Sequence, residues 1–503
     1  MAAQQIKSVA IIGAGAAGAA AAAAFGAEEC FDTIRVFERR HSAGGTWIYD
    51  KSPKTNVQLV PGALPPDIDR PLKIPDQLPT TTAPTSQERY EQTPIYDELT
   101  TNVPAIAMSF SDIPFPYGPF TPHWIPRQYI EGYFSSHRTD SYLVLNTTVE
   151  DVSRLLAKTS SGLDKWKLVL RQYDTVKQAD VWWEEVFDSI IIANGHYSIP
   201  FVPPVTGLAE YLKTFPGRVS HSKTYRTPEA YRGKRVIVIG NSASGHDITT
   251  ALVKVARLPV YQSRRSRSRW DGDKPPDGIE WKPVIKEYRN NGDVVLDDDS
   301  VLSSVDDIIY CTGYRPSFPF WNSQANGRPL FDYRENRLIG NYLHTFLGDF
   351  PTLGIVGLPR VLTFRSFEYQ AIALARLFAG RNAIPLPPRE VQRRWEENRA
   401  ELVRRESRKF HDIPWDNGET MQWLGLLFEM AGLPKLEGTG RCPPILNRET
   451  RWAIENIKKY PERGRGNREL RSRAPQDPKT DDQIDADWVV LPADEVKDTL
   501  HLI

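Results

Sequence analysis

Cysteine is scarce in this chain, and the three that occur are widely separated. Cys30, Cys311 and Cys442 show no Cys-x-x-Cys spacing among 503 residues. A disulfide scaffold, a zinc site built on cysteines and a dithiol reductase all need cysteines close together, so the sequence argues against each. We expect no metal site, and we expect a reducing compartment, the cytoplasm.

An excess of one charge and long apolar segments are also lacking. Lysine plus arginine and aspartate plus glutamate both total 63, so the formal net charge is zero. No overall field attracts nucleic acid or an anionic membrane, and we expect neither as a partner. Residues 9–27 are uncharged, but they are mostly alanine and glycine, which are poor partners for lipid. We therefore expect no membrane span.

The glycines of that uncharged stretch have the spacing of a dinucleotide-binding turn. A strand, Val9–Ile12, leads into Gly-x-Gly-x-x-Gly (residues 13–18) and a helix to about Ala27, and a second strand, Ile34–Phe37, ends at Glu38. Glycines allow a pyrophosphate to approach closely, and the helix N-terminus attracts it. An acid about 20 residues onward holds a ribose 2′-hydroxyl and repels a 2′-phosphate, which predicts FAD or NAD.

A second glycine turn lies near the middle of the chain. A strand at residues 235–239 runs into Gly-x-Ser-x-x-Gly (residues 240–245), where serine replaces the usual second glycine. The next strand, Pro259–Gln262, is soon followed by Arg264 and Arg265, where the first unit has an acid. Guanidinium groups suit bidentate phosphate binding. The contrast predicts FAD in the first unit and NADP in the second.

The segment before the second turn carries a family resemblance. Phe215-x-Gly217-x-x-x-His221-x-x-x-Tyr225 matches the signature of the flavin-containing monooxygenases. The chain resembles that family over most of its length, and it resembles the soluble fungal and yeast-like members most closely. The other matching motifs are the two glycine turns, Glu38, Gly44-Gly45-Thr46-Trp47, Leu99-x-Thr101-Asn102-x-Pro104 and Cys311-Thr312-Gly313-Tyr314.

The resemblance implies FAD and NADPH as cofactors, with O2 and a small molecule as substrates, in an N,N-dimethylaniline monooxygenase-like enzyme. Reduced flavin would react with O2 to give a C4a-hydroperoxide, which oxygenates a nucleophilic nitrogen or sulfur atom. Such chemistry asks the protein mainly for positioning and exclusion of water. The physiological substrate stays open, with an intermediate of specialised metabolism as one candidate. The oligomeric state also stays open, with a homodimer as one alternative.

By the same resemblance, Asn102 is the expected catalytic residue, since its amide would contact both NADP⁺ and the flavin edge. FAD is expected to contact Gly13, Gly15, Ala16, Ala17, Gly18, Glu38, Gly45, Thr46, Trp47, Thr101 and Asn102. NADP is expected to contact Asn102, His221, Tyr225, Gly240, Ser242, Ala243, Gly245, Arg264 and Arg265. The motif histidine and tyrosine are expected to shape the hinge between domains rather than to transfer protons.

Three alternative functions remain. A Baeyer–Villiger monooxygenase inserts oxygen beside a ketone, and those relatives usually end the motif in tryptophan. This chain has Tyr225-Arg226 there, which favours oxygenation of a heteroatom. A pyridine-nucleotide reductase would share the two-unit layout, but the Cys-x-x-Cys pair is missing. A redox sensor without enzymatic activity would not need two intact nucleotide sites.

The predicted fold class is α/β. We expect two Rossmann-like dinucleotide-binding domains arranged as in disulfide reductases, with the NADP domain inserted in the FAD domain. The expected boundaries are 1–213 and 306–460 for the FAD domain, 214–305 for the NADP domain and 461–503 for a polar tail. Residues 51–93 are interpreted as a long, partly mobile loop. The helix expected at residues 389–409 alternates arginine with glutamate, which predicts a solvated surface.

Overall fold

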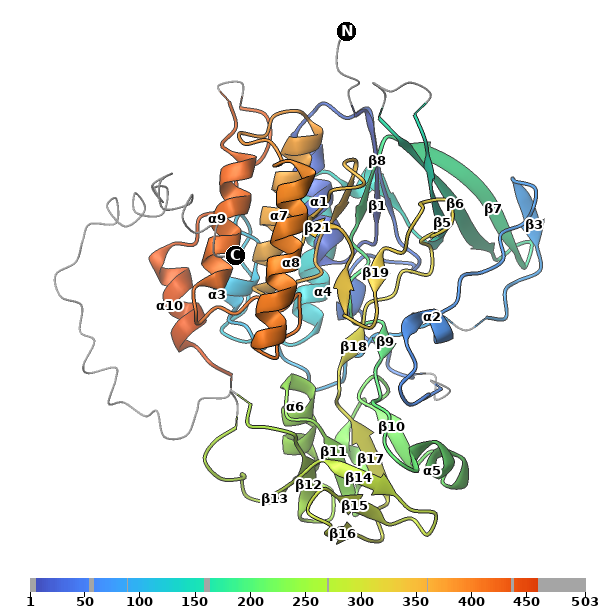
Figure 1. Cartoon of the computed structure of the whole chain (residues 1–503), viewed down its shortest axis with the longest axis vertical. Coiled ribbons are helices and arrows are strands. Elements are labelled where there is room, and N and C mark those ends of the chain that lie inside the picture. Colours follow the sequence, from blue (N-terminus) through green and yellow to red (C-terminus); the bar gives the residue numbers. More distant parts are fainter. Residues whose placement is uncertain are drawn as a thin grey trace, which may run out of the picture.

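The computed structural model describes residues 6–53, 58–87, 89–157, 163–268, 271–359, 361–435 and 438–459. They form two α/β units, drawn as the larger, upper body and the smaller, lower body in Figure 1. The expected polar tail, residues 461–503, lies outside the described residues. Within the described part, no helix is both long and apolar enough to cross a membrane.

The larger unit is built on a seven-stranded sheet with the order β21-β22-β23-β8-β1-β2-β4. Its strands are β1 (Ser8–Ile12), β2 (Thr33–Phe37), β4 (Leu143–Val144), β8 (Ser189–Ile192), β21 (Asn341–Tyr342), β22 (Phe346–Leu347) and β23 (Leu353–Ile355). Strand β1 pairs in parallel with β2 on one side and with β8 on the other. The first glycine turn therefore leaves the sheet from a central strand.

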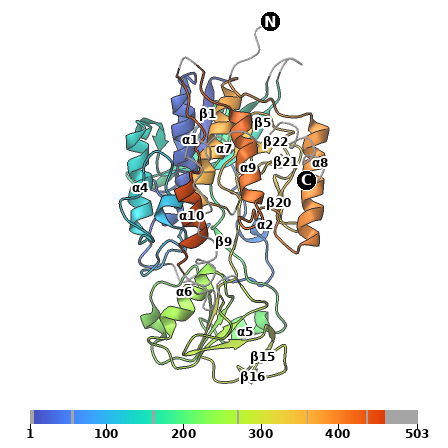
Figure 2. The same cartoon turned by 90° about the vertical axis from the view of Figure 1, so that its left-hand side faces the viewer.

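Helices cover one face of this sheet. Helix α1 (Ala16–Ala27) packs along α7 (Thr363–Phe378), and α7 packs in turn on α9 (Glu419–Ala431), as Figures 1 and 2 show. Every residue of α1 from its first alanine to Phe25 is buried. Small alanine side chains let the backbones of α1 and α7 approach closely, which explains the alanine-rich composition. Helix α4 (Trp124–Ser136) flanks α1.

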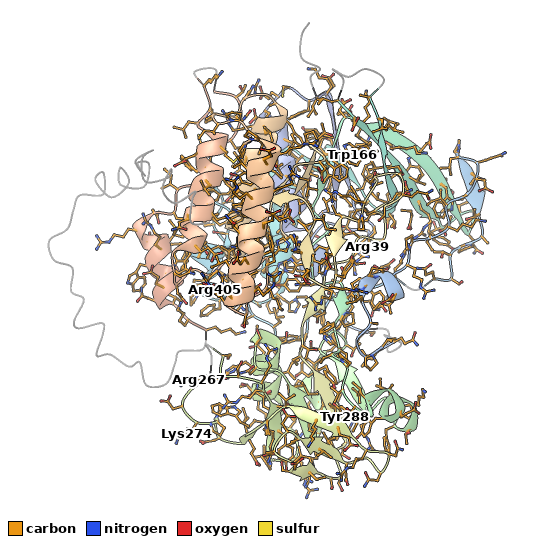
Figure 3. All side chains as sticks on the ribbon, viewed as in Figure 1. Arg39, Trp166, Arg267, Lys274, Tyr288 and Arg405 are labelled. Atoms are coloured by element: carbon orange, nitrogen blue, oxygen red, sulfur yellow. The ribbon has the colours of Figure 1, made fainter. Side chains whose placement is uncertain are left out.

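A four-stranded antiparallel sheet lies in the same unit, with the order β3-β7-β6-β5. Its strands are β3 (Thr80–Thr82), β5 (Thr147–Leu155), β6 (Lys165–Asp174) and β7 (Ala179–Phe187). The buried Trp166 of β6 packs in a core that also contains residues of β1 and β8, and Figure 3 labels it in the upper body. The expected loop at residues 51–93 is therefore partly wrong, because β3 and helix α2 (Pro65–Ile68) belong to it.

The smaller unit contains a five-stranded parallel sheet with the order β10-β17-β11-β12-β13. Its strands are β10 (Val219–His221), β11 (Val236–Ile239), β12 (Val260–Ser263), β13 (Ile279–Lys282) and β17 (Asp307–Tyr310). Helix α6 (Ala243–Leu252) follows the second glycine turn, and α5 (Leu208–Thr214) precedes the sheet. The remaining strands β14 (Ile285–Tyr288), β15 (Val294–Leu296) and β16 (Val301–Leu302) form a separate antiparallel sheet.

The boundaries of the smaller unit differ from those expected, 214 and 305. Strand β17 pairs between β10 and β11, so the unit extends through Tyr310. At the other end, Leu208 and Tyr211 of α5 lie in its hydrophobic core. The two crossings between the units are β9 (Ile199–Pro200) and β18 (Tyr314–Arg315), which pair with each other. The expected boundary failed because the sequence pattern does not show which sheet β17 joins.

The solvated surface expected of the arginine-rich helix is confirmed for most of its arginines and wrong for one of them. In α8 (Arg389–Arg405), Arg399 is only 3 % exposed. Its Nη1 lies 2.5 Å from Glu419 Oε1 of α9, and its Nε donates to the carbonyl of Phe410. Charged residues dominate the composition of α8, but one stripe of them is buried against partners from distant segments.

Beside this stripe, two buried histidines make the folded state sensitive to acid. His411 Nε2 accepts from the Leu338 amide, so His411 Nδ1 donates to His344 Nδ1 at 2.9 Å. Burial, and then the nearby Arg399 charge, holds the pKa of both histidines well below the ordinary range. The unfolded chain binds protons below about pH 6.5, whereas the folded chain does not. Each histidine thus stabilises the fold above that pH and loses its contribution as the pH falls.

We expect the free energy of unfolding to fall by up to about 1.4 kcal/mol per pH unit for each histidine below pH 6.5. Denaturant unfolding at several pH values between 7 and 5 measures how the free energy of unfolding changes with pH. The double variant His344→Gln/His411→Gln is the reference. Equal slopes for the two proteins would contradict the prediction.

Candidate cofactor and active site

The first glycine turn has a backbone that only glycine can form. Gly13 has φ +107°, and a Cβ there would stand 2.7 Å from the carbonyl oxygen of Ala193. A Cβ on Gly18 would stand 1.9 Å from the carbonyl oxygen of Gly13. A Cβ on Gly45 would stand 2.7 Å from the Cα of Gly15. The turn and the Gly44–Gly45 segment thus meet backbone to backbone, beside the N-terminus of α1.

Glu38 lies at the end of β2 and is fixed beside this turn. Its buried carboxylate accepts hydrogen bonds from the amides of Ala14 and Arg40, both at 2.9 Å. A carboxylate in this position suits a ribose hydroxyl. Gly45, Thr46 and Trp47 form one short 3₁₀ helix, η1 (Gly45–Trp47). The remaining expected residues, Ala16 and Ala17, are buried in the first turn of α1.

The second glycine turn repeats the geometry of the first. Gly240 has φ +112°, and its Cβ would stand 2.7 Å from the carbonyl oxygen of Cys311. A Cβ on Gly245 would stand 2.1 Å from the carbonyl oxygen of Gly240. Ser242 is the N-cap residue of α6, and Ala243 begins the helix. The serine substitution therefore leaves the phosphate-binding form of the turn intact.

Beyond β12, a buried aspartate organises the arginine loop. Asp271 Oδ2 accepts from Arg264 Nη1 at 2.9 Å, from Asn241 Nδ2 at 2.7 Å and from the Ser268 amide at 2.8 Å. The Arg264 guanidinium also stacks on Trp281, 3.5 Å from the ring centroid. One carboxylate thus ties the glycine turn to the arginine loop.

The same loop lines a small cavity of about 330 Å³. Four cationic side chains border it: Arg264, Arg265, Arg267 and Lys282. Arg265 and Arg267 are exposed, and Figure 3 shows Arg267 toward the outer edge of the lower unit. Such a set of cations suits a phosphate monoester. The sequence motifs identified the first two arginines and missed Lys282, Trp281 and Asp271.

The motif residues between the turns are buried, which supports the expected hinge role over an acid–base role. His221 is buried, and its Nδ1 accepts from the Lys223 amide at 3.1 Å. Its Nε2 therefore donates to the Gly313 carbonyl at 3.1 Å. Burial, and then the Lys223 charge, lowers the pKa of His221 to about 3, so the ring stays neutral. Tyr225 is buried with its ring 5.6 Å from that of Tyr96.

Arg226 fastens the hinge to the larger unit, a role that the sequence did not reveal. Its Nε donates to the carbonyl of Asp50 at 2.6 Å, and its Nη2 donates to the carbonyl of Thr93 at 3.0 Å. Lys223 Nζ donates nearby to the carbonyl of Gln92 at 2.5 Å, and burial lowers the pKa of this lysine to about 7. Hinge residues and the 51–93 segment therefore form one continuous interface.

Asn102 is exposed on a loop of the larger unit at this interface. The preceding Thr101 is buried, and its amide and side-chain oxygen bond the carbonyl and amide of Thr121 at 2.8 and 3.0 Å. The Thr100 carbonyl accepts from Lys459 Nζ, which also pairs with Asp247 of α6 in the smaller unit. The loop is thus anchored at the two residues directly before Asn102.

Comparison with known proteins decides the family. "Flavin-containing monooxygenase FMO GS-OX-like 4" of Arabidopsis thaliana is 31 % identical over 395 residues, which cover 76 % of this chain and 78 % of the relative. This chain belongs to the flavin-containing monooxygenase family. The family description "Flavin-binding monooxygenase-like" matches residues 85–270, and "NAD(P)-binding Rossmann-like domain" matches residues 11–71. The resemblance found in the sequence is therefore confirmed.

Two further relatives extend over more of this flavin-containing monooxygenase. "Flavin-containing monooxygenase iboF" of Amanita muscaria (strain Koide BX008) is 29 % identical over 456 residues, which cover 79 % of this chain and 83 % of the relative. The solved structure of S-allyl-L-cysteine S-oxygenase from Allium sativum aligns with 99 % of both chains, with a TM-score of 0.70 and 25 % identity. The α/β fold with two Rossmann-like domains is confirmed.

This flavin-containing monooxygenase uses FAD and NADPH, and its residues fit both. The first glycine turn would hold the FAD pyrophosphate, because a Cβ on Gly18 or Gly45 would displace backbone there. Glu38 would receive the ribose of FAD. The second glycine turn would hold the NADPH pyrophosphate in the same way. The cations of the arginine loop would bind the extra phosphate of NADPH.

Asp271→Ala is expected to raise the KM for NADPH roughly tenfold, because charge-assisted hydrogen bonds of this kind contribute about 1.5–3 kcal/mol each. Arg264 and Asn241 would lose the shared acceptor that holds them. The KM for NADH, which lacks the 2′-phosphate, should change less. Steady-state kinetics gives the KM for each nucleotide, and Glu210→Ala, at an exposed ion pair of α5, is the control. An equal rise for both nucleotides would contradict the prediction.

Proposed function

We propose that this NADPH-dependent flavin monooxygenase oxygenates a nucleophilic sulfur or nitrogen atom of a small molecule. The observation that carries the proposal is its likeness over 99 % of its length to a solved S-oxygenase. That relative acts on S-allyl-L-cysteine, so thioethers are the first class to test. The motif supports the same reaction class, because it ends in Tyr225 where ketone-oxidising relatives usually have tryptophan.

Bound FAD, once reduced by NADPH, supplies the reaction with O2. The chain's own residues bind, orient and exclude water. The two glycine turns hold the pyrophosphates, and Glu38 and the arginine loop distinguish the two nucleotides. His221 is neutral and donates its only N–H to a backbone carbonyl, so it serves the hinge and leaves proton transfer to other groups. Asn102 extends from its anchored loop and would contact the nicotinamide nucleotide and the flavin edge.

Asn102→Ala is expected to retain FAD but to lose at least roughly tenfold in product formed per NADPH consumed, if one hydrogen bond to the reacting cofactors disappears. The backbone of the loop should persist, because Thr101 and Thr121 hold it independently of the amide side chain. Oxygenated product and NADPH consumption are measured together. Asn291→Ala, in an exposed turn of the smaller unit, is the control. An unchanged product yield would refute the role of Asn102.

The proposal is tested by incubating the holoenzyme with NADPH, air and either a thioether, a tertiary amine or a cyclic ketone. Mass spectrometry separates a sulfoxide or N-oxide from a lactone. A heteroatom oxide is the expected product. A lactone from the ketone, with no oxidation of sulfur or nitrogen, would establish the Baeyer–Villiger alternative in its place.

A further inference from the structure

A cavity of about 800 Å³ lies beside the Asn102 loop and is used by none of the residues above. It is bordered by α3 (Ala105–Met108), by the loop at residues 109–119 and by α10 (Arg448–Asn456). Helices α3 and α10 pack together and lie at the lower left of the larger unit in Figure 1, close to α6. Its volume is in the usual range for a small-molecule site.

Most of the cavity wall is apolar, and one buried cation faces it. Ile106, Phe110, Phe115, Ile445 and Ile457 form the apolar wall. Arg365 lines the same cavity and is only 6 % exposed. Burial of a guanidinium group is costly unless it is paired, so its partners indicate what the cavity can receive.

The Arg365 guanidinium is only partly satisfied. Its Nε donates to the Ser109 carbonyl at 3.0 Å, and its Nη2 donates to the Ile106 carbonyl at 3.2 Å. Among the described residues, Nη1 has no hydrogen-bond partner. Glu368 Oε2 lies 3.8 Å from Nε, but that carboxylate already accepts from the amide and hydroxyl of Ser111 and from Arg441. Nη1 therefore remains a charged donor at the cavity wall.

A second donor lies on the same wall. Asn447 caps the N-terminus of α10, where its Oδ1 accepts from the Thr450 amide at 2.8 Å. The cap fixes the side chain by its oxygen, so the amide nitrogen Nδ2 stays available to donate. A guanidinium and an amide N–H group together match the acceptor pattern of a carboxylate.

The cavity adjoins the cofactor site through aromatic side chains. Its border begins at Pro104, two residues after Asn102. Phe110 and Phe115 pack on Phe364 with centroid distances of 5.3 and 5.9 Å. Phe364 in turn meets Trp47 of the FAD-binding segment at 6.4 Å. Phe364 thus separates the lining of the cavity from the expected FAD-binding segment by a single aromatic ring.

We propose that this cavity binds the acidic end of the substrate, and that Arg365 selects thioethers or amines carrying a carboxylate. The apolar wall takes the hydrocarbon part of the molecule, and Arg365 Nη1 with Asn447 Nδ2 takes the carboxylate. S-substituted amino acids are the simplest members of this class. The inference rests on the proposed heteroatom oxygenation and adds the substrate class.

The test compares S-propyl-L-cysteine with S-propylcysteamine, which lacks only the carboxylate. Wild-type holoenzyme should have the lower KM for the acid. Arg365→Met should raise that KM about ten- to a hundredfold while the KM for the cysteamine stays within about twofold. Arg365→Lys, which keeps the charge, should restore part of the preference. Arg232→Met, at an exposed ion pair of the smaller unit, should change neither value.

Two further measurements keep the outcomes separate. Ile106→Trp would narrow the cavity without removing the cation, and it should weaken both thioethers. Equilibrium binding of S-propyl-L-cysteine to the oxidised holoenzyme, followed by calorimetry, reports on the cavity without turnover. Equal losses for both thioethers in Arg365→Met, or unchanged binding of the acid, would overturn the inference. Tight, Arg365-dependent binding with no sulfoxide formed would support the site and overturn the proposed reaction.

Discussion

Replacing Gly18 by alanine is expected to yield a protein that no longer retains FAD. The new Cβ would stand 1.9 Å from the Gly13 carbonyl oxygen, far inside van der Waals contact. The backbone on both sides of the phosphate-binding turn must then move apart. Overpacking of this kind costs about 1–3 kcal/mol, and the turn loses the geometry that binds the pyrophosphate, so affinity should fall roughly 10- to 100-fold.

The flavin content of the purified protein checks this expectation. It is measured from the ratio of flavin absorbance to protein absorbance and should fall by about tenfold. Gly132→Ala is the matched control, because Gly132 lies inside α4 and a Cβ there meets nothing within 4 Å. Thermal unfolding distinguishes a lost cofactor from a lost fold. Full flavin content in the Gly18 variant would show that the first turn does not bind FAD.

Gly245→Ala is expected to have the opposite signature, a yellow protein that NADPH reduces slowly. Its Cβ would stand 2.1 Å from the Gly240 carbonyl oxygen, so the second turn is deformed in the same way. The larger unit, with its own sheet and core, is untouched. The apparent affinity for NADPH should fall roughly 10- to 100-fold, while FAD stays bound.

Anaerobic flavin reduction at several NADPH concentrations measures this loss. Reduction by dithionite, which needs no nucleotide site, is the internal control and should be unchanged. Normal reduction by NADPH, or loss of FAD from the Gly245 variant, would contradict the division of cofactors between the two turns. The pair of variants thus tests each turn against the other.

Much of the fold and of the cofactor sites could be predicted because these sites are local in sequence. A glycine turn, its strand and its helix occupy about 20 consecutive residues, so Gly13 and Gly240 could be assigned from spacing alone. Short, largely apolar runs likewise marked β1, β2, β11 and β12 near their observed positions. The family motif added Asn102 and the hinge.

The remaining features depend on contacts that spacing does not encode. Asp271 organises the arginine loop because the chain folds back after β12, and Arg365 faces a cavity whose other wall comes from α10. The burial of Arg399 could not be predicted, since its partners Glu419 and Phe410 come from other segments. Pairing of β17 with β10 and β11 likewise depends on tertiary structure. It explains why the smaller unit extends past the expected boundary at residue 305.

The paired crossings β9 and β18 have a consequence for how the chain could be divided. Because Ile199 and Pro200 pair with Arg315 and Tyr314, the smaller unit leaves and rejoins the larger one at neighbouring points. The larger unit therefore sees the inserted unit as one surface loop with adjacent ends. The entropy cost of closing such a loop rises only slowly with its length. A short linker joining the two crossings should therefore leave a separable flavoprotein core, and the excised unit would have adjacent ends suited to cyclisation or to grafting.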